Sequence, residues 1–258
     1  MNQTERRIFL IKYLLAEHPN LQQEIPEDGT DQIRMLRGLM NIREPKPVSH
    51  EILAVQDAYL QEERSPEKVV HLADLEPVQP GIYLVKGDIT MLECGAIVNA
   101  ANSGMTGCYQ PCHNCIDNCI HTYAGVQLRL KCAEIMAEQG YEEPTGQAKI
   151  TPAYNLPCDY VIHTVGPIVR GELTREHCAL LKSCYRSCLK LADENGVGSI
   201  AFCCISTGVF MFPNEKAAEI AVDTVQKYKA ETGSKIEVIF NVFKEQDERI
   251  YRELLRAD

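Results

Sequence analysis

The segment from Gly107 to His121 concentrates residues that bind metals, with four cysteines and two histidines. Zn²⁺ prefers thiolate and imidazole ligands in tetrahedral coordination. Structural zinc sites usually have four protein ligands, often as two separated pairs, whereas this cluster occupies one loop and no distant second pair is evident. The pattern therefore favours three protein ligands and one open position, as in a catalytic zinc site, over a chance cluster of reduced cysteines.

Three of these residues are the best candidates for zinc ligands, because they precede the expected helix on flexible backbone. They are Cys108, His113 and Cys115. Cys112 is their main competitor. Cys119 and His121 should lie within the helix, where their side chains point in different directions.

The remaining histidines and cysteines have simpler explanations. His121 is expected to pack or to cap its helix, and His163, in a strand, to be a hydrogen-bonded core histidine. Cys184 and Cys188 lie four residues apart on one helix face and are expected to be buried small side chains. Twelve cysteines in a chain without an evident secretion signal indicate reduced thiols rather than a disulfide framework.

Two polar motifs follow apolar segments. Gly87-Asp88-Ile89-Thr90 comes after Ile82–Val85. An aspartate at a strand end can accept a hydrogen bond from an exocyclic amine or a ribose hydroxyl, although a turn aspartate is the commoner explanation. In Ile97–Asn102 an apolar strand runs into two asparagines that flank two alanines. A carboxamide there can bind a sugar hydroxyl, and the alternative is an Asx turn.

A further motif, Ile205–Pro213, joins a buried strand to a helix. Serine, threonine and glycine at such a junction form a backbone site for anions. The aromatic residues Phe210 and Phe212 would wall a sugar or a base. Junctions of this type are common in α/β folds, so the motif has low specificity by itself.

Short apolar runs alternate with longer helical patterns from about residue 78. The expected strands are Ile82–Val85, Ala96–Asn99, Ala148–Thr151, Tyr160–Thr164, Ser199–Ile205 and Lys235–Val242. The expected helices span about 116–139, 174–194, 214–231 and 246–256. Strands with little alternation, separated by helices, predict an α/β fold with a mostly parallel sheet covered on both faces. Such sheets bind ligands beyond the carboxyl ends of their strands.

Apolar residues recur at helical spacing before this region. Pro45–Pro47 and Arg64–Pro66 interrupt the pattern, which contains no catalytic constellation. We interpret residues 1–77 as a helical extension and residues 78–258 as the main domain.

The composition is that of an ordinary globular protein, with 45% hydrophobic and 24% charged residues among 258. The formal net charge of −10 argues against bulk nucleic-acid binding, although backbone N–H groups can still hold a small phosphate ligand. No segment approaches the ~20 apolar residues of a membrane span, and the N-terminus lacks a secretory pattern. We therefore expect a cytoplasmic protein with no membrane or nucleic-acid partner.

Taken in order, these motifs resemble those of macrodomains. The matching segments are Gly87–Thr90, Ile97–Asn102, Asp117–Gly125, Val165–Pro167 and Ser206–Pro213. The resemblance covers residues 80 to 258 and is specific because five spaced motifs match. It implies a three-layer α/β/α sandwich with a mixed, mostly parallel sheet.

Most macrodomains carry a run of glycines where this chain has Cys108 to Cys115. That loop, with its Cys-x4-His-x-Cys pattern, and the helical extension resemble the zinc-dependent macrodomains of bacteria and some fungi. Bacterial members are associated with a sirtuin-type ADP-ribosyltransferase and a lipoyl-carrier protein related to glycine-cleavage protein H. They resemble hydrolases that remove mono-ADP-ribose from such acceptors.

The resemblance implies roles for individual residues. Asp88 would bind the adenine amine with Ile89 beside it, and Asn102 would hold the distal ribose. The helix N-terminus near Asp117 would hold one phosphate. The other would lie on the backbone of Ser206, Thr207, Gly208, Val209 and Phe210. Both placements suit a diphosphate, because helix N-termini and stacked amides favour anions.

The expected reaction is zinc-dependent hydrolysis of the ester between ribose C1″ of ADP-ribose and an acidic side chain. The open zinc position would bind a ribose hydroxyl or a water of lowered pKa. Asp117 would orient that water or brace the loop, and Asn102 would fix the sugar. Attack at the anomeric carbon and attack at the ester carbonyl both remain open. One rival interpretation is a non-catalytic ADP-ribose reader; another is a structural zinc that leaves catalysis to Asp117.

Overall fold

The computed structural model describes residues 1–21 and 23–256. Its α-helices are α1 (Gln3–Glu17), α2 (Gly29–Ile42), α3 (His50–Glu63), α4 (Ile116–Ala124), α5 (Val126–Gln139), α6 (Arg175–Glu194), α7 (Asn214–Thr232) and α8 (Glu245–Leu255). Its strands are β1 (Val70–His71), β2 (Ile82–Lys86), β3 (Leu92–Glu93), β4 (Ala96–Ala101), β5 (Ala148–Pro152), β6 (Tyr160–Val165), β7 (Ser199–Phe202) and β8 (Glu237–Val242). Short 3-10 helices are η1 (Pro66–Lys68), η2 (Leu72–Asp74) and η3 (Ile89–Met91).

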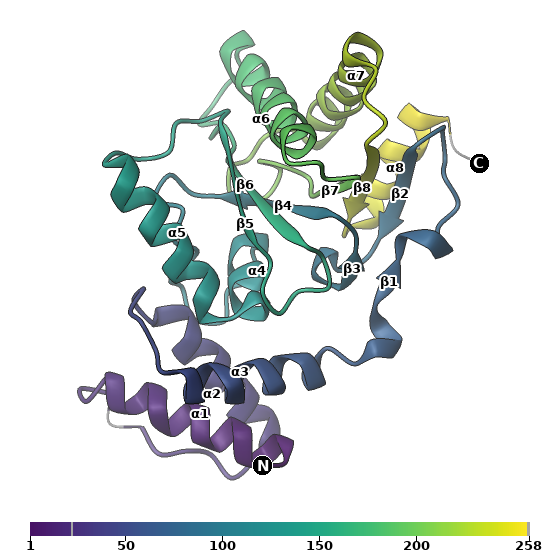
Figure 1. The fold of residues 1–258 in the computed structure, drawn as a ribbon. Helices are drawn as coiled ribbons and strands as arrows, with labels where there is room; N and C mark the ends of the chain where they lie inside the picture. Colours follow the sequence, from purple (N-terminus) through teal and green to yellow (C-terminus); the bar gives the residue numbers. More distant parts are fainter. Residues whose placement is uncertain (22, 257–258) are drawn as a thin grey trace.

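The main sheet has six strands in the order β2-β8-β7-β4-β6-β5 (Figure 1). Every neighbouring pair is parallel except β5 and β6, which are antiparallel. The order departs from the sequence order, so β4 lies at the centre of the sheet. The mixed, mostly parallel sheet that the sequence predicts is confirmed.

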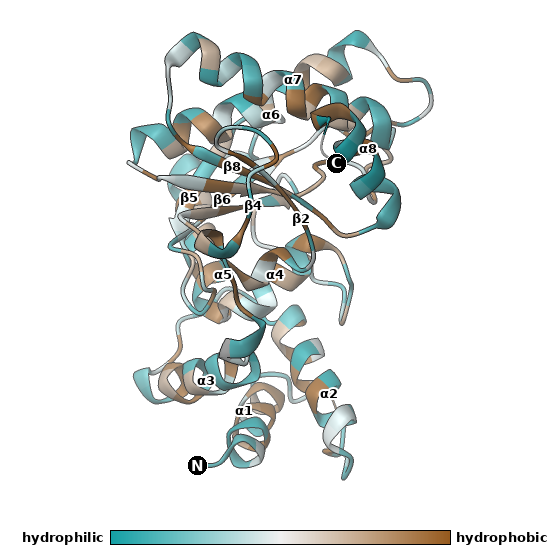
Figure 2. Ribbon diagram, turned by 90° about the vertical axis from the view of Figure 1, so that its right-hand side faces the viewer, coloured by the Kyte–Doolittle hydropathy of each residue, from teal (hydrophilic) through white to brown (hydrophobic). Residues whose placement is uncertain are grey.

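Helices cover both faces of this sheet. Helices α4 and α5 lie on one face, and α6, α7 and α8 lie on the other (Figure 1). One apolar core joins the sheet to α6, α7 and α8, and a second joins it to α4 and α5. Hydrophobic colours run along the central strands in Figure 2, because a strand covered on both faces has no side that meets water. The fold is the three-layer α/β/α sandwich expected from the resemblance.

Two expected elements differ from those observed. The predicted helix 116–139 is broken at Gly125, whose φ of 95° suits glycine and ends α4 before α5 begins. The strand predicted over Ser199–Ile205 ends at Phe202. Beyond it the chain turns out of the sheet, and Ser206 adopts a φ of +66°.

The N-terminal helices form a body with a core of their own, built from residues such as Ile11, Leu36 and Tyr59. Asn2, Asp28 and Ser49 cap the N-termini of α1, α2 and α3. Helix α2 contacts α4, so this body lies against the α4–α5 side of the sandwich, opposite α6 and α7 (Figure 1). In the described part of the chain, no helix combines the length and apolar character that crossing a bilayer requires.

Candidate functional site

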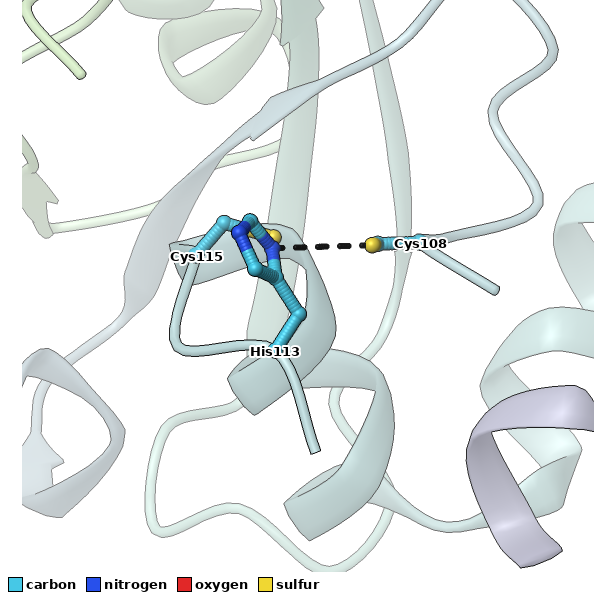
Figure 3. Close-up of side chains that lie close together, drawn as sticks. All are labelled: Cys108, His113 and Cys115. Atoms are coloured by element: carbon cyan, nitrogen blue, oxygen red, sulfur yellow. Dashed lines mark hydrogen bonds between the residues drawn. The ribbon is translucent and has the colours of Figure 1, made fainter. Parts of the chain in front are cut away.

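The three predicted metal ligands come together at the start of α4. Cys108, His113 and Cys115 are half-buried, and their ligand atoms all lie within 4.8 Å of one another. Cys108 approaches from one side while His113 and Cys115 lie on the other, with 3.7 Å between Cys108 Sγ and His113 Nδ1 (Figure 3). We call these three residues the loop cluster.

The backbone explains why these side chains converge and Cys112 does not. Cys115 is the N-cap of α4, and its Sγ accepts a hydrogen bond from Asn118 N at 3.4 Å. Cys112 has a φ of +55°, which turns the chain between the ligands. Its Sγ contacts the Arg34 carbonyl at 3.3 Å and does not belong to the loop cluster.

The loop cluster fits zinc by its geometry and its donor set. Zn–S and Zn–N bonds in a tetrahedral site place sulfur and nitrogen about 3.6 Å apart, close to the observed 3.7 Å between Cys108 and His113. Burial raises the pKa of the Cys115 thiol to about 12. That sulfur would therefore need a cation beside it to be held as a thiolate, and a zinc ion would meet this need.

Asp117 lies in the first turn of α4, two residues after Cys115, and is buried with 5% of its surface exposed. Asn99 Nδ2 donates to its Oδ1 at 2.8 Å, and Asn102 Nδ2 donates to its Oδ2 at 3.2 Å. Burial raises the pKa of Asp117 to about 6, against the lowering effects of Asn99, Arg129 and Asn102. A carboxyl group that titrates so close to neutrality suits proton transfer.

Asn102 connects Asp117 to the loop. Its Nδ2 also donates to Gly107 O at 3.1 Å, and its Oδ1 accepts from Gly104 N at 3.0 Å. The carboxamide that the sequence assigns to a ribose hydroxyl therefore also holds Asp117 and the residue before Cys108. Sequence reasoning gave no role to Asn99, although it stands in the same motif.

The proposed adenine residues lie at the carboxyl end of β2. Asp88 is exposed and caps η3, with its Oδ1 accepting from Thr90 N at 2.9 Å. Ile89 is 2% exposed, and its side chain belongs to the core. Phe243 follows β8, the neighbour of β2, and its ring is 78% exposed. The sequence could not identify Phe243, because it does not reveal that β8 lies beside β2.

The segment after β7 forms a tight turn at the same edge of the sheet. Ser206 has a φ of +66°, and Phe212 N returns a hydrogen bond to Ser206 O at 3.0 Å. Gly166 makes room for this turn, since a Cβ there would meet Ser206 Oγ at 2.1 Å. The Val165–Pro167 motif is therefore required for the packing of the second loop.

The backbone of this turn is suited to an anion. The N–H groups of Gly208, Val209 and Phe210 donate no hydrogen bond to any acceptor in residues 1–21 and 23–256. The Oγ of Ser206 is buried and likewise has no partner in that part of the chain. Phe212 is 1% exposed within the core, so the role expected for it as a wall of the pocket is wrong. Phe210 stays half-buried at the surface.

A second group of potential ligands lies in the interior. His121, Cys132 and His163 are buried, and their ligand atoms also lie within 4.8 Å of one another. We call these residues the core cluster. His163 is hydrogen-bonded on both ring nitrogens, to Asn99 at 3.1 Å and to Thr151 at 3.0 Å, as expected for a core histidine. The sequence missed the cluster because its members come from α4, α5 and β6.

Comparisons with known proteins agree with this geometry. A family model described as Macro domain matches residues 98–221. A protein-ADP-ribose hydrolase from Treponema medium is 61% identical over 99% of this chain and 100% of its own length. Another of that name from Staphylococcus aureus (strain MSSA476) is 52% identical over 91% of this chain and 88% of its own.

Solved structures give the same result. A Trypanosoma brucei macrodomain in complex with ADP-ribose superposes with a TM-score of 0.66 and 31% identity, covering 89% of this chain and 97% of that one. An Oceanobacillus iheyensis macrodomain with ADP gives 0.63 and 35%, covering 70% and 94%. This chain therefore belongs to the macrodomain family, in the bacterial group whose members carry the name protein-ADP-ribose hydrolase.

Proposed function

We propose that this chain is a zinc-dependent hydrolase that removes mono-ADP-ribose from modified proteins. The observation that carries the proposal is the loop cluster, in which three ligands converge beside the buried carboxyl of Asp117. The names of the relatives support the hydrolase activity, and the T. brucei complex supports ADP-ribose as the group bound. Three ligands within the described residues leave one tetrahedral position for substrate or water.

Cys108, His113 and Cys115 would hold the zinc, which when bound supplies Lewis-acid polarisation and lowers the pKa of water. Asp117 accepts a proton from the attacking water, with its carboxyl oriented by Asn99 and Asn102. Water adds across the bond between C1″ and the ester oxygen of an aspartate or glutamate. The products are a free carboxyl group and ADP-ribose.

The rest of the cleft binds the non-reacting part of ADP-ribose. The exposed carboxylate of Asp88 accepts a hydrogen bond from the adenine amine, and the exposed ring of Phe243 stacks on the base. One phosphate lies on the free N–H groups of Gly208–Phe210 and the other at the N-terminus of α4. These contacts hold the distal ribose against the loop cluster.

We further propose which proteins supply the substrate. The resemblance to zinc-dependent macrodomains supports a sirtuin-type ADP-ribosyltransferase as the enzyme that adds the group. It supports a lipoyl-carrier protein related to glycine-cleavage protein H as an acceptor. We propose that the ADP-ribose is attached through an acidic side chain of that acceptor.

The test is release of ADP-ribose from a protein mono-ADP-ribosylated on acidic side chains, before and after zinc is removed with a chelator. We expect release to stop and to return when zinc is added back. Cys108→Ser should behave as the zinc-free protein. Cys112→Ser is the matched control from the same loop, and it should keep both zinc and turnover because its thiol faces the Arg34 carbonyl.

Each other outcome supports a different function. Release that is indifferent to zinc keeps the hydrolase and makes the metal structural. Tight binding of ADP-ribose without release makes the chain a reader and rejects the enzyme. Loss of zinc in Cys112→Ser but not in Cys108→Ser would mean that Cys112, and not Cys108, is a zinc ligand.

A further inference from the structure

Helix α2 of the N-terminal extension contacts the loop that carries the proposed zinc ligands. Arg37 lies on the side of α2 that faces α4, and its Nη2 donates to the His113 carbonyl at 2.8 Å. The same Nη2 lies 3.2 Å from Asn118 Oδ1. One guanidinium group therefore holds the backbone of a ligand residue and a side chain of the first turn of α4.

Asn118 extends this connection to the other side of the loop. Its Nδ2 donates to the carbonyls of Cys108, at 3.3 Å, and Gln110, at 3.0 Å. Asn118 is fully buried. The Arg37 guanidinium can only donate hydrogen bonds, so the Asn118 amide must turn its Oδ1 toward it. The same orientation directs Nδ2 toward the loop.

A second residue of α2 holds the middle of the loop. Asn41 is 1% exposed, and its Oδ1 accepts from Cys112 N at 2.8 Å. Its Nδ2 donates to Thr122 Oγ1 of α4 at 2.9 Å. Cys112 has the left-handed φ of +55°, a conformation that a non-glycine residue adopts at an energetic cost. The hydrogen bond that Cys112 N donates to Asn41 Oδ1 stabilises this turn.

A third contact joins α2 to the loop through α5. Arg129 donates to the carbonyls of Asn41, at 2.7 Å, and Arg43, at 2.6 Å, at the end of α2. Its guanidinium lies over the ring of Tyr109, 4.2 Å from the ring centroid. Tyr109 follows Cys108 directly, so this stacking restrains the first ligand.

The loop has little structure of its own. Between Cys108 and Cys115, one backbone hydrogen bond within the loop occurs in the described chain, from His113 N to Gln110 O at 3.2 Å. Ordering such a segment costs conformational entropy of about 1–2 kcal/mol per residue. The contacts from α2 are therefore needed to present three ligands in one arrangement before the metal arrives.

We propose that Arg37 and Asn41 are positioning residues for the loop cluster, and that the N-terminal extension is part of the metal site. This inference rests on the proposed zinc site. Neither side chain belongs to the loop cluster; both act through backbone and side-chain groups of the loop and α4. Their loss is expected to weaken zinc retention and turnover together.

The test compares zinc affinity, by competition with a chromophoric chelator, in full-length wild type, Arg37→Ala and Asn41→Ala. We expect each variant to bind zinc about 10- to 100-fold more weakly, the usual effect of removing a group that supports a metal ligand. The matched control is Arg34→Ala, which removes an exposed arginine one turn earlier on the same helix. Its affinity should equal that of wild type.

Further measurements separate positioning from general destabilisation. Arg37→Lys keeps the charge but loses the planar fork, so it should recover part of the affinity. Binding of ADP, which depends on the adenine and phosphate sites, should stay within twofold of wild type while kcat falls. Amides of residues 107–115 should exchange hydrogen faster in Arg37→Ala than in Arg34→Ala.

The remaining outcomes are distinct. Wild type without zinc would reject the proposed zinc site and this inference with it. Wild type with zinc, and both alanine variants with unchanged affinity, would reject the positioning role alone. If Arg37→Ala does not fold, Asn41→Ala decides, since full zinc affinity in that variant would show that the contact of α2 with Cys112 is dispensable and would reject the positioning role.

Discussion

The loop cluster and the core cluster each bring three cysteine and histidine side chains together, yet their surroundings are opposite. In both, three cysteine or histidine ligand atoms lie within 4.8 Å of one another. The loop cluster is half-buried on an irregular segment, whereas the core cluster is buried between helices and the sheet. In the loop cluster His113 Nδ1 faces Cys108 Sγ. In the core cluster both nitrogens of His163 already serve Asn99 and Thr151.

Proximity of ligands is therefore not sufficient for a metal site. A metal also needs lone pairs that are not committed to other partners, and a path by which it can enter. Asn99 Nδ2 donates toward His163 Nδ1, so the other ring nitrogen carries the proton and cannot ligate. Gly107 packs on the His121 ring, where a Cβ would meet ring atoms at 2.8 Å, and all three residues of the core cluster are buried.

The largest expected effect is on zinc. Cys108→Ser should weaken zinc binding by more than about 100-fold, because even the loss of a supporting group costs about 10- to 100-fold. Cys132→Ser, the same change in the core cluster, should leave zinc content at one ion per chain. Metal analysis after dialysis against a weak chelator measures both. Two ions in wild type and one in Cys132→Ser would mean that the clusters are equivalent.

Much of the fold was predictable, because hydrophobic patterning reports the elements that need burial. Six expected strands correspond to the six strands of the main sheet. The break at Gly125 was not predictable from the apolar pattern, which continues across it into α5. Periodicity also cannot predict the strand order, and that order places Phe243 and Asp88 beyond the carboxyl ends of two neighbouring strands.

The proximity of the loop cluster could be predicted because its three residues are close in sequence. The contacts of Arg37 and Asn41 could not, since they join positions 71 to 81 residues apart. The core cluster was missed for the same reason. From their places in an expected helix and an expected strand, His121 was predicted to pack or to cap and His163 to be a core histidine. Both are buried, but the sequence did not predict that they are neighbours.

Asp117 lies between the two clusters, and its substitution separates their roles. It contacts Asn102 on the side of the loop and Asn99 on the side of the core, and its Oδ1 is 3.6 Å from His121 Nε2. Asp117→Asn should lower kcat about 100-fold, because general-base catalysis contributes at least that factor. Zinc content should not change. Loss of zinc with the activity would instead make Asp117 a brace for the loop.

A smaller effect concerns stability, and there the core cluster should be the more sensitive. Cys132 is 1% exposed and packs with Ile120 and Leu128. Cys132→Ala should lower the free energy of unfolding by about 1–2 kcal/mol, as expected for a small cavity in a packed core. Cys112→Ala, at a half-buried position, should change it by less than about 0.5 kcal/mol. Urea denaturation of the zinc-free proteins measures both changes. Equal losses of unfolding free energy in the two variants would mean that the core cluster is no more sensitive than the loop.

The smallest expected effect is a dependence of stability on pH from His163. Burial lowers its pKa to about 3, compared with about 6.5 in an unfolded chain. Above pH 6.5 the ring is neutral in both states, so its hydrogen bonds contribute fully. As the pH falls from 6.5 toward 3, the unfolded state binds a proton that the folded state does not, and stability is lost. The stability advantage of wild type over His163→Gln should therefore shrink by about 1 kcal/mol between pH 7 and pH 5.5. An advantage that stays constant over this range would mean that the ring binds a proton as readily in the folded protein as in the unfolded chain, and that His163 is not the neutral, hydrogen-bonded histidine that sets the core cluster apart from the loop cluster.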